Sequence, residues 1–350
     1  MKSRKPVFRH PGLPKNDLGR TRKDYEGLDS TLCAGCGHDS VTNGIIQACF
    51  ELSIEPHRVA KLSGIGCSSK TPAYFLNKSH GFNSVHGRMA SIATGANMAN
   101  KDLLYIGVSG DGDTASIGMG QFIHVVRRNL NMVYIVMNNG CYGLTKGQDS
   151  ATADKGSASK KGRPNPFEAI DLCEMAVQMG AGFVARGFSG DKEQLVPLLK
   201  AAIRHKGFAL VDVISPCVTF NNTPSSTKSY HWARDHMEAS GTFDVIPERQ
   251  AITTQYEEGT TQSVALHDGT VIQLHKTDNS FDVTNRRSAI NAIEDHREKG
   301  HILTGILHIN ETLQDTHDII ETTDKPLNAL TQEELCPGNQ TLQQIFETYR

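Results

Sequence analysis

The sequence predicts an α/β protein with a doubly wound parallel sheet, and two observations carry this prediction. Between about residues 40 and 215, apolar β-branched runs alternate with longer helix-like stretches. Strand–helix–strand repetition at this spacing gives a parallel sheet with helices on both faces. In addition, the motifs rich in glycine, cysteine and acidic residues follow the predicted strands, at the sheet edge where such folds place their sites.

The composition suits a globular protein without a nucleic-acid or membrane partner. The chain has 350 residues, 38% of them hydrophobic, and a formal net charge of −2, so no basic surface is indicated. No apolar run approaches the roughly 20 residues that a membrane helix needs. The basic N-terminus lacks the apolar stretch of a secretory signal. We therefore expect a cytoplasmic location, where the eight cysteines are free to bind metal.

The alternation defines the elements in order. Predicted strands cover residues 58–66, 102–110, 131–139, 182–188 and 208–215, and predicted helices cover 40–53, 87–100, 116–129, 167–180 and 191–207. One loop, 146–165, interrupts the rhythm; its Ser, Gly and Lys content predicts a mobile lid.

The chain divides into three predicted parts. Residues 1–30 form an extended arm, because their prolines and glycines discourage a helix. Residues 31–245 form the binding domain. Residues 246–350 form an α+β extension, with strands at 270–276 and 301–309 and helices at 285–300 and 330–349.

Two turn motifs predict a site for a metal ion and a phosphate group. The sequence Gly110-Asp111-Gly112-Asp113 ends one strand, and Asn138-Asn139-Gly140 ends the next, with 25 residues between Gly112 and Asn138. One helix and one strand fill that interval, so both motifs return to the same edge of the sheet. Glycines allow close approach of the backbone, and the oxygens of Asp111 and Asn139 suit Mg²⁺.

Other glycine-loop sites fit this region poorly. GDGDTAS lacks the third glycine of a dinucleotide-binding loop, and GIGCSSKT lacks the Gly-Lys pair of a nucleotide-binding P-loop. The spacing of GDG and NN instead resembles thiamine-diphosphate enzymes. That resemblance implies that Asp111 and Asn139 bind Mg²⁺ together with the backbone carbonyl of Cys141.

Four cysteines form a second candidate site. Cys33 and Cys36 lie in LCAGCGH, Cys67 ends the first predicted strand, and Cys217 ends the last. A thioredoxin-type redox pair needs no further cysteines. A four-thiolate site holds zinc or an iron–sulfur cluster, and one C-x-x-C pair with two isolated cysteines is looser than typical zinc. Small buried thiols explain the remaining Cys49, Cys173 and Cys336.

The order of LCAGCGH, GIGCSS, HGR, GDGD and NNxxYGLTKGQ over residues 30–225 resembles the β subunits of 2-oxoacid:ferredoxin oxidoreductases. The resemblance implies a thiamine-diphosphate-binding fold and a [4Fe–4S] cluster on Cys33, Cys36, Cys67 and Cys217. It further implies an α subunit carrying the pyrimidine-binding domain, in a dimer of αβ heterodimers, with ferredoxin as electron acceptor. The implied reaction converts a 2-oxoacid and coenzyme A to an acyl-CoA and CO₂, reversibly.

The motifs also predict which individual residues bind the cofactor and the substrate. The predicted cofactor-binding residues are Gly110, Asp111, Gly112, Asp113, Asn139, Cys141, Tyr142, Gly143, Leu144, Thr145, His86, Cys36, Ser68 and Ser69. For the substrate, Lys70 or Lys146 offers a cation to a second carboxylate, which 2-oxoglutarate has and pyruvate lacks. With Leu144 and His86 as further candidates, the sequence favours 2-oxoglutarate, although exposed lysines and a structural histidine are equally ordinary explanations.

Three alternatives stay open from the sequence. The chain fits a non-redox thiamine decarboxylase subunit whose CAGC motif binds zinc, or an iron–sulfur electron-transfer module without chemistry of its own. Within the same chemistry, pyruvate, a branched-chain oxoacid or an indolic oxoacid replaces 2-oxoglutarate.

Overall fold

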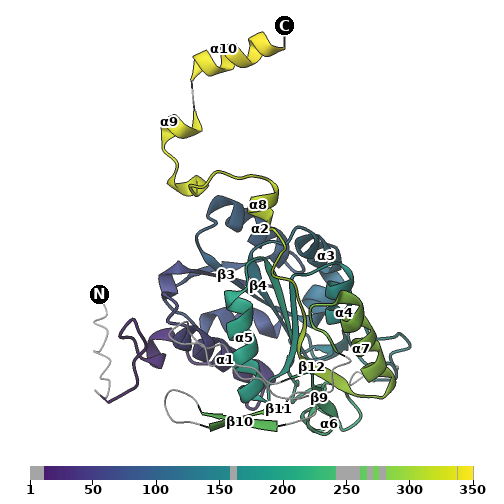
Figure 1. Cartoon of the computed structure of the whole chain (residues 1–350). Coiled ribbons are helices and arrows are strands. Elements are labelled where there is room, and N and C mark those ends of the chain that lie inside the picture. Colours follow the sequence, from purple (N-terminus) through teal and green to yellow (C-terminus); the bar gives the residue numbers. More distant parts are fainter. Residues whose placement is uncertain are drawn as a thin grey trace.

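The computed structural model describes residues 12–157, 164–241, 261–265, 271–275, 281–336 and 338–349. Its centre is an eight-stranded sheet with the order β2-β1-β3-β4-β8-β7-β12-β9 (Figure 1). The predictions for residues 1–11, 158–163, 246–260, 266–270 and 276–280 lie outside the described residues.

The five predicted strands are all present and mutually parallel, which confirms the doubly wound fold. They are β1 (Val59–Ser63), β3 (Leu104–Gly110), β4 (Met132–Asn138), β7 (Phe183–Phe188) and β8 (Phe208–Ile214). Three shorter or later strands complete the sheet: β2 (His80–Asn83), β9 (Met237–Ala239) and β12 (Ile302–Ile309).

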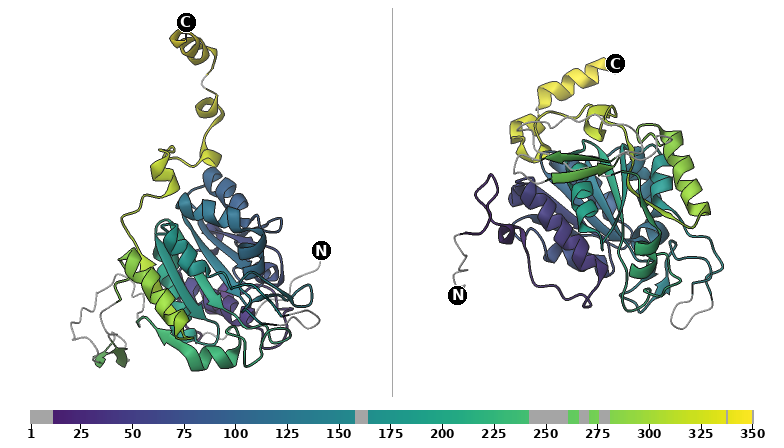
Figure 2. Two further views of the ribbon diagram at one scale, coloured as in Figure 1. Left: turned by 90° about the vertical axis from the view of Figure 1, so that its right-hand side faces the viewer. Right: turned by 60° about the horizontal axis from the view of Figure 1, so that its bottom comes forward.

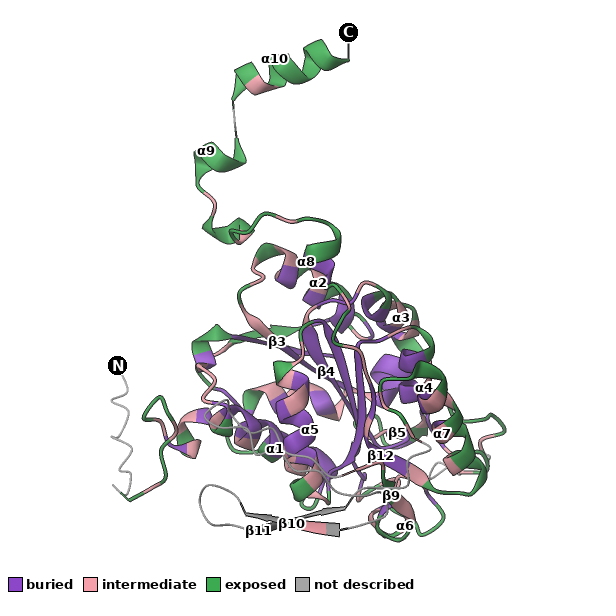
Figure 3. Cartoon of the chain, viewed as in Figure 1, coloured by how far each residue is buried: buried purple, intermediate pink, exposed green. Residues whose placement is uncertain are grey.

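Helices cover both faces of the sheet, and the strands alternate to match them. On one face lie α1 (Gly37–Glu51) and α5 (Lys192–Arg204). On the other lie α2 (Met89–Ala99), α3 (Met119–Arg127), α4 (Leu172–Gln178) and α7 (Arg286–Glu298). On β4, Ile135 joins the first cluster and Tyr134 the second. The central strands are therefore buried on both sides (Figure 3), as parallel sheets require.

Shorter elements connect and extend this core. They are η1 (Arg22–Tyr25), η2 (Pro56–Arg58), η3 (Cys67–Ala73), the π-helix η4 (Gly112–Ile117), β5 (Cys141–Tyr142), β6 (Gln148–Asp149), α6 (Tyr230–His236), β10 (Thr261–Ala265), β11 (Val271–His275), α8 (Thr316–Ile319), η5 (Leu327–Ala329), α9 (Gln332–Leu335) and α10 (Asn339–Thr348). No helix among the described segments is long and apolar enough to cross a bilayer.

Parts of the predicted arm and of the predicted extension contact the central domain. The described end of the N-terminal arm packs on the domain: Tyr25 is fully buried, and Glu26 forms a bridge with Phe75. At the other end, β12 pairs antiparallel with β7, so the extension completes the main sheet.

The predicted helix at 330–349 is wrong as one element. Gly338, with a φ of 90°, separates α9 from α10, because this backbone conformation cannot continue a helix. Both helices extend away from the body of the molecule (Figures 1 and 2).

A buried lysine holds the segment after β1. Lys61 is 7% exposed, and its ammonium group donates to the backbone carbonyls of Pro72, Phe75 and Leu76. Burial lowers the pKa of Lys61 to about 8, which leaves it charged at neutral pH. These bonds tie η3, which carries Cys67, to the sheet.

Replacing this lysine should therefore destabilise the fold. In Lys61→Met, buried carbonyl groups lose a charged donor, and we expect a loss of about 1–3 kcal/mol in the free energy of unfolding. Lys78→Met, at an exposed position, is the matched control and should change it by less than about 0.5 kcal/mol. Equal melting temperatures for the two variants would contradict the assigned role.

Candidate functional site

The predicted site motifs lie along one edge of the sheet. Strands β1, β3, β4 and β8 are parallel neighbours, so their carboxyl ends share that edge. The edge carries Cys67 after β1, Asp111 after β3, Asn139 after β4 and Cys217 after β8.

Asp111 is a buried carboxylate with an ordered set of donors. It is 1% exposed; its Oδ1 accepts from the backbone N–H of Asn139 at 3.2 Å, and its Oδ2 accepts from the hydroxyls of Ser150 and Thr152. Burial raises the pKa of Asp111, and these hydrogen bonds oppose the rise. The Asn139 side chain, 4% exposed, accepts from the backbone N–H of Cys141 at 3.1 Å. Both motifs thus place hard oxygen atoms together.

Asp113 acts mainly as a structural anchor. Its carboxylate accepts from the backbone N–H groups of Ile65 at 3.1 Å and Gly87 at 2.7 Å, and from the Ser109 hydroxyl at 2.7 Å. His86 Nδ1 lies 2.5 Å from the same carboxylate as an ion-pair contact without the alignment of a hydrogen bond. Asp113 therefore joins the loops after β1, β2 and β3, and its contact with a cofactor stays a prediction.

These residues surround a small cavity of about 100 Å³. Its lining contains His86, Gly110, Asp111, Gly112, Asp113, Asn139, Cys141, Tyr142, Gly143, Leu144, Thr145 and Ser68 from the predicted set, together with His38, Ile65, Gly66 and Cys67. The Ser68 hydroxyl is 1% exposed and has no hydrogen-bond partner among the described residues. A buried hydroxyl of this kind needs a ligand atom to satisfy it.

The segments that carry the four cysteines lie against each other. The Gly37 N–H donates to Pro216 O at 3.1 Å, and the Thr219 hydroxyl contacts the exposed Cys33 Sγ at 3.6 Å. A Cβ added to Gly143 would lie 3.4 Å from Cys217 Sγ and 3.5 Å from Cys67 Sγ.

Within the described residues, no group of three or more Cys, His, Asp or Glu side chains is close enough to hold a metal. The cluster on the four cysteines therefore stays a prediction. Cys33, on the exposed turn before Cys36, is the cysteine of the four with the least packing around it.

The thiols of Cys36, Cys67 and Cys217 differ in their pKa values. The pKa of Cys217 is lowered to about 6 by hydrogen bonds from the Cys141 thiol and from the backbone N–H groups of Thr219, Phe220 and Asn221. Burial raises the pKa of Cys36 to about 12 and also raises that of Cys67. Of these cysteines, Cys217 is thus the one whose surroundings favour the thiolate form.

The predicted substrate residues lie in different places. Leu144 is half exposed and lines the cavity with Thr145, whereas Lys70 and Lys146 are not among the lining residues. Lys70 is half-buried, and its charge opposes the rise in the pKa of Cys67. Lys146 is exposed. The Ser69 hydroxyl donates to Gly66 O at 2.7 Å. Neither lysine lines the cavity.

The sequence analysis missed three buried residues of the site. Ser150 and Thr152 are 6% and 1% exposed and bind Asp111, so this part of the 146–165 loop is packed into the site, against the prediction of a mobile lid. Their alternation in DSAT is the signal that was available. His38, 1% exposed, lies 2.7 Å from the Ser215 hydroxyl, and burial lowers its pKa to about 4.

The fold and the site define a thiamine-diphosphate-binding domain. Residues 64–213 match the family model "Thiamine pyrophosphate enzyme, C-terminal TPP binding domain". A curated relative from Sulfolobus sp., a 2-oxoacid:ferredoxin oxidoreductase subunit beta, is 40% identical over 65% of this chain and 72% of its own length.

Two further comparisons agree. A 2-oxoglutarate synthase subunit KorB from Methanocaldococcus jannaschii is 41% identical over 55% of this chain and 71% of its own. The solved 2-oxoglutarate:ferredoxin oxidoreductase from Magnetococcus marinus, with 2-oxoglutarate, coenzyme A and succinyl-CoA bound, gives a TM-score of 0.69 at 31% identity over 86% of this chain and 88% of that chain. The chain belongs to the β subunits of the 2-oxoacid:ferredoxin oxidoreductases, an enzyme family.

Gly112 should be indispensable in this site. A Cβ at this position would lie 2.5–2.9 Å from the Tyr142 ring, whose hydroxyl donates to Gly112 O at 3.0 Å. We expect Gly112→Ala to weaken thiamine diphosphate binding at least about tenfold, measured by calorimetric titration, because Tyr142 must leave the cavity wall.

The control for this variant is Gly95→Ala in α2. A Cβ there meets open space, so cofactor binding should not change, and stability should rise by up to about 1 kcal/mol. Unchanged affinity in Gly112→Ala would show that the Tyr142 wall is dispensable.

Proposed function

We propose that this chain is the β subunit of a 2-oxoglutarate:ferredoxin oxidoreductase. The reaction is 2-oxoglutarate + CoA + 2 oxidised ferredoxin → succinyl-CoA + CO₂ + 2 reduced ferredoxin + H⁺, with reductive carboxylation as its reverse. The observation that carries the proposal is one sheet edge that joins the Asp111–Asn139 oxygens to the thiols of Cys67, Cys141 and Cys217.

The oxygen end of this edge fits thiamine diphosphate and Mg²⁺. Asp111, Asn139 and the Cys141 carbonyl would hold the metal, and Ser68 offers its unpartnered hydroxyl. When bound, thiamine diphosphate accepts the electron pair that a departing CO₂ leaves behind. His86 Nδ1 faces Asp113, so Nε2 is the ring atom left to reach a ligand. Tyr142 and Gly112 form one wall of the cavity.

The thiol end fits a [4Fe–4S] cluster on Cys33, Cys36, Cys67 and Cys217. When bound, such a cluster carries single electrons toward ferredoxin. The chain's own contribution is the anionic Cys217, stabilised by three backbone N–H groups, and a glycine-rich turn at 33–37 packed against 215–219. Cys36 lies near enough to Cys67 and Cys217 for their thiols to interact electrostatically, and Cys33 lies near enough to Cys67.

The cavity also indicates a partner subunit. Its 100 Å³ is small beside the roughly 300 Å³ or more of ligand pockets, so a second wall is needed. We assign that wall to an α subunit with the pyrimidine-binding domain, in a dimer of αβ heterodimers in the cytoplasm. CoA and 2-oxoglutarate, bound in the Magnetococcus marinus enzyme, would enter between the two subunits.

The substrate assignment is tested with the αβ complex. Viologen reduction with CoA should be faster on 2-oxoglutarate than on pyruvate. Lys70→Met or Lys146→Met should raise KM for 2-oxoglutarate about tenfold or more, and leave KM for pyruvate unchanged, because only the first substrate has a second carboxylate. Faster turnover on pyruvate by the unaltered complex would overturn the assignment.

The cluster assignment has a separate test. Anaerobically purified complex should lose about four irons per β subunit in Cys217→Ser and in Cys67→Ser. The exposed Cys336→Ser is the control and should keep them. Zinc in place of iron, or iron that both substitutions leave in place, would favour a non-redox thiamine enzyme.

A further inference from the structure

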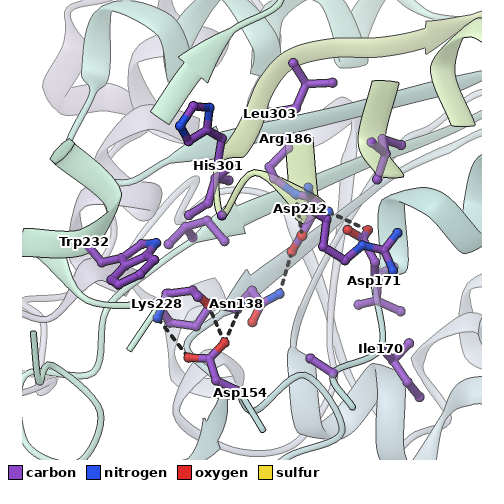
Figure 4. A pocket seen from close by; sticks show the side chains of 18 residues that line it. Asn138, Asp154, Ile170, Asp171, Arg186, Asp212, Lys228, Trp232, His301 and Leu303 are labelled. Carbon is purple, nitrogen blue, oxygen red and sulfur yellow. Dashed lines mark hydrogen bonds and ion pairs between the residues drawn. The ribbon is translucent and has the colours of Figure 1, made fainter. Parts of the chain in front are cut away.

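A chain of buried polar groups leads from Asp111 to an ion pair behind the site. Asp111 Oδ2 lies 2.8 Å from Thr152 Oγ1, which lies 3.0 Å from Asn138 Oδ1. Asn138 Nδ2 donates to Asp212 Oδ1 at 3.1 Å, and Asp212 Oδ2 accepts from Arg186 Nε at 3.3 Å. All five residues are at most 8% exposed. The outer end of the chain lines a cavity of about 180 Å³ (Figure 4).

The strand register fixes the outer end of this chain. Arg186 on β7 pairs directly with Asp212 on β8, and Asn138 is the last residue of the neighbouring β4. Arg186 also binds the half-buried Asp171, so one guanidinium serves two carboxylates. Burial raises the pKa of Asp212, and the charge of Arg186 opposes that rise. The guanidinium of Arg186 thereby favours the anionic form of Asp212.

The anionic acceptor determines how the Asn138 amide is oriented. A carboxylate only accepts hydrogen bonds, so the NH₂ group must face Asp212 and the carbonyl oxygen must face Thr152. Asn138 Oδ1 is buried, and Thr152 is the donor that reaches it. An oxygen in that position needs a donor to avoid the cost of an unsatisfied buried group.

Thr152 has one hydroxyl proton and three oxygen neighbours. Besides Asp111 Oδ2 and Asn138 Oδ1, Ser150 Oγ lies at 3.1 Å. The proton therefore serves Asp111 or Asn138, but not both. Asp111 keeps Ser150 and the Asn139 N–H as donors in either case.

We propose that Asn138, held by the Asp212–Arg186 pair, is the alternative acceptor that lets Thr152 release Asp111 to a metal ion. Thr152, Asn138, Asp212 and Arg186 are positioning residues, because they act through Asp111. The inference rests on the proposed Mg²⁺–thiamine diphosphate site. The proposal explains why Asn138, the first asparagine of the NN pair, is buried in a chain of polar groups although it does not line the 100 Å³ cavity.

The proposed switch predicts opposite changes in metal affinity for two variants. Asp212→Asn lets the Asn138 amide reverse and keeps the Thr152 hydroxyl on Asp111, so it should weaken Mg²⁺ binding about 10–100-fold, the usual range for residues behind a metal ligand. Thr152→Val removes the hydroxyl that competes with the metal for Asp111, so it should strengthen Mg²⁺ binding about three- to tenfold. Thr152→Ser keeps the hydroxyl and should stay within about threefold of the unaltered protein. At saturating Mg²⁺, the affinity for thiamine diphosphate should change by less than about threefold in all variants.

The experiment uses the αβ complex stripped of metal by a chelator. Mg²⁺ is titrated calorimetrically with thiamine diphosphate present and no oxoacid, and melting temperatures check the fold. Thr304→Val, a buried threonine on β12, is the matched control and should bind Mg²⁺ normally.

Two outcomes separate the proposed switch from the function on which it rests. If the unaltered complex shows no Mg²⁺-dependent cofactor binding, the proposed function fails. If it binds and Thr152→Val binds Mg²⁺ no more tightly, the proposed switch fails. Should Asp212→Asn not fold, the comparison of Thr152→Val with Thr152→Ser tests the proposal by itself. A purely structural role of Thr152 would change the affinities for Mg²⁺ and for thiamine diphosphate alike, whereas the proposed role changes only the affinity for Mg²⁺.

Discussion

The site depends on one constraint: four adjacent parallel strands must end at the same edge of the sheet. Hydrogen bonding between β1, β3, β4 and β8 fixes their register, and buried side chains on both faces leave no freedom to slip. Residues as distant in sequence as Cys67 and Cys217 thereby lie beside one glycine, Gly143. Helices cover both faces of the sheet, so the polar side chains of the site lie at its carboxyl edge, where they line the cavity.

The same constraint explains which parts were predictable from the sequence. Strands such as β4 are buried on both faces, so their sequences are continuous apolar runs. The GDG and NN motifs directly follow such runs. By contrast, β2 is an exposed edge strand, HGFN, with no apolar pattern to mark it. The predicted helix at 330–349 runs across Gly338, whose left-handed backbone separates α9 from α10.

The residues that sequence analysis missed share a physical reason. Ser150 and Thr152 are short polar side chains in a stretch whose composition is that of an exposed loop. Their burial follows from the charge of Asp111, which needs donors when it is removed from water. A linear pattern shows a carboxylate after a strand, but not which distant hydroxyls satisfy it. The positions of Asp113 and His38 follow from contacts of the same long-range kind.

The edge carries two kinds of polar group. Asp111 and Asp113 are carboxylates held by hydroxyl and backbone donors. Hydrogen bonds from Cys141 and from backbone N–H groups lower the pKa of the Cys217 thiol. Cys141 belongs to both groups, since its backbone N–H donates to Asn139 and its thiol donates to Cys217. A displacement of Cys141 would therefore disturb Asn139 and Cys217 together. One buried residue links the oxygen end of the site to its thiol end.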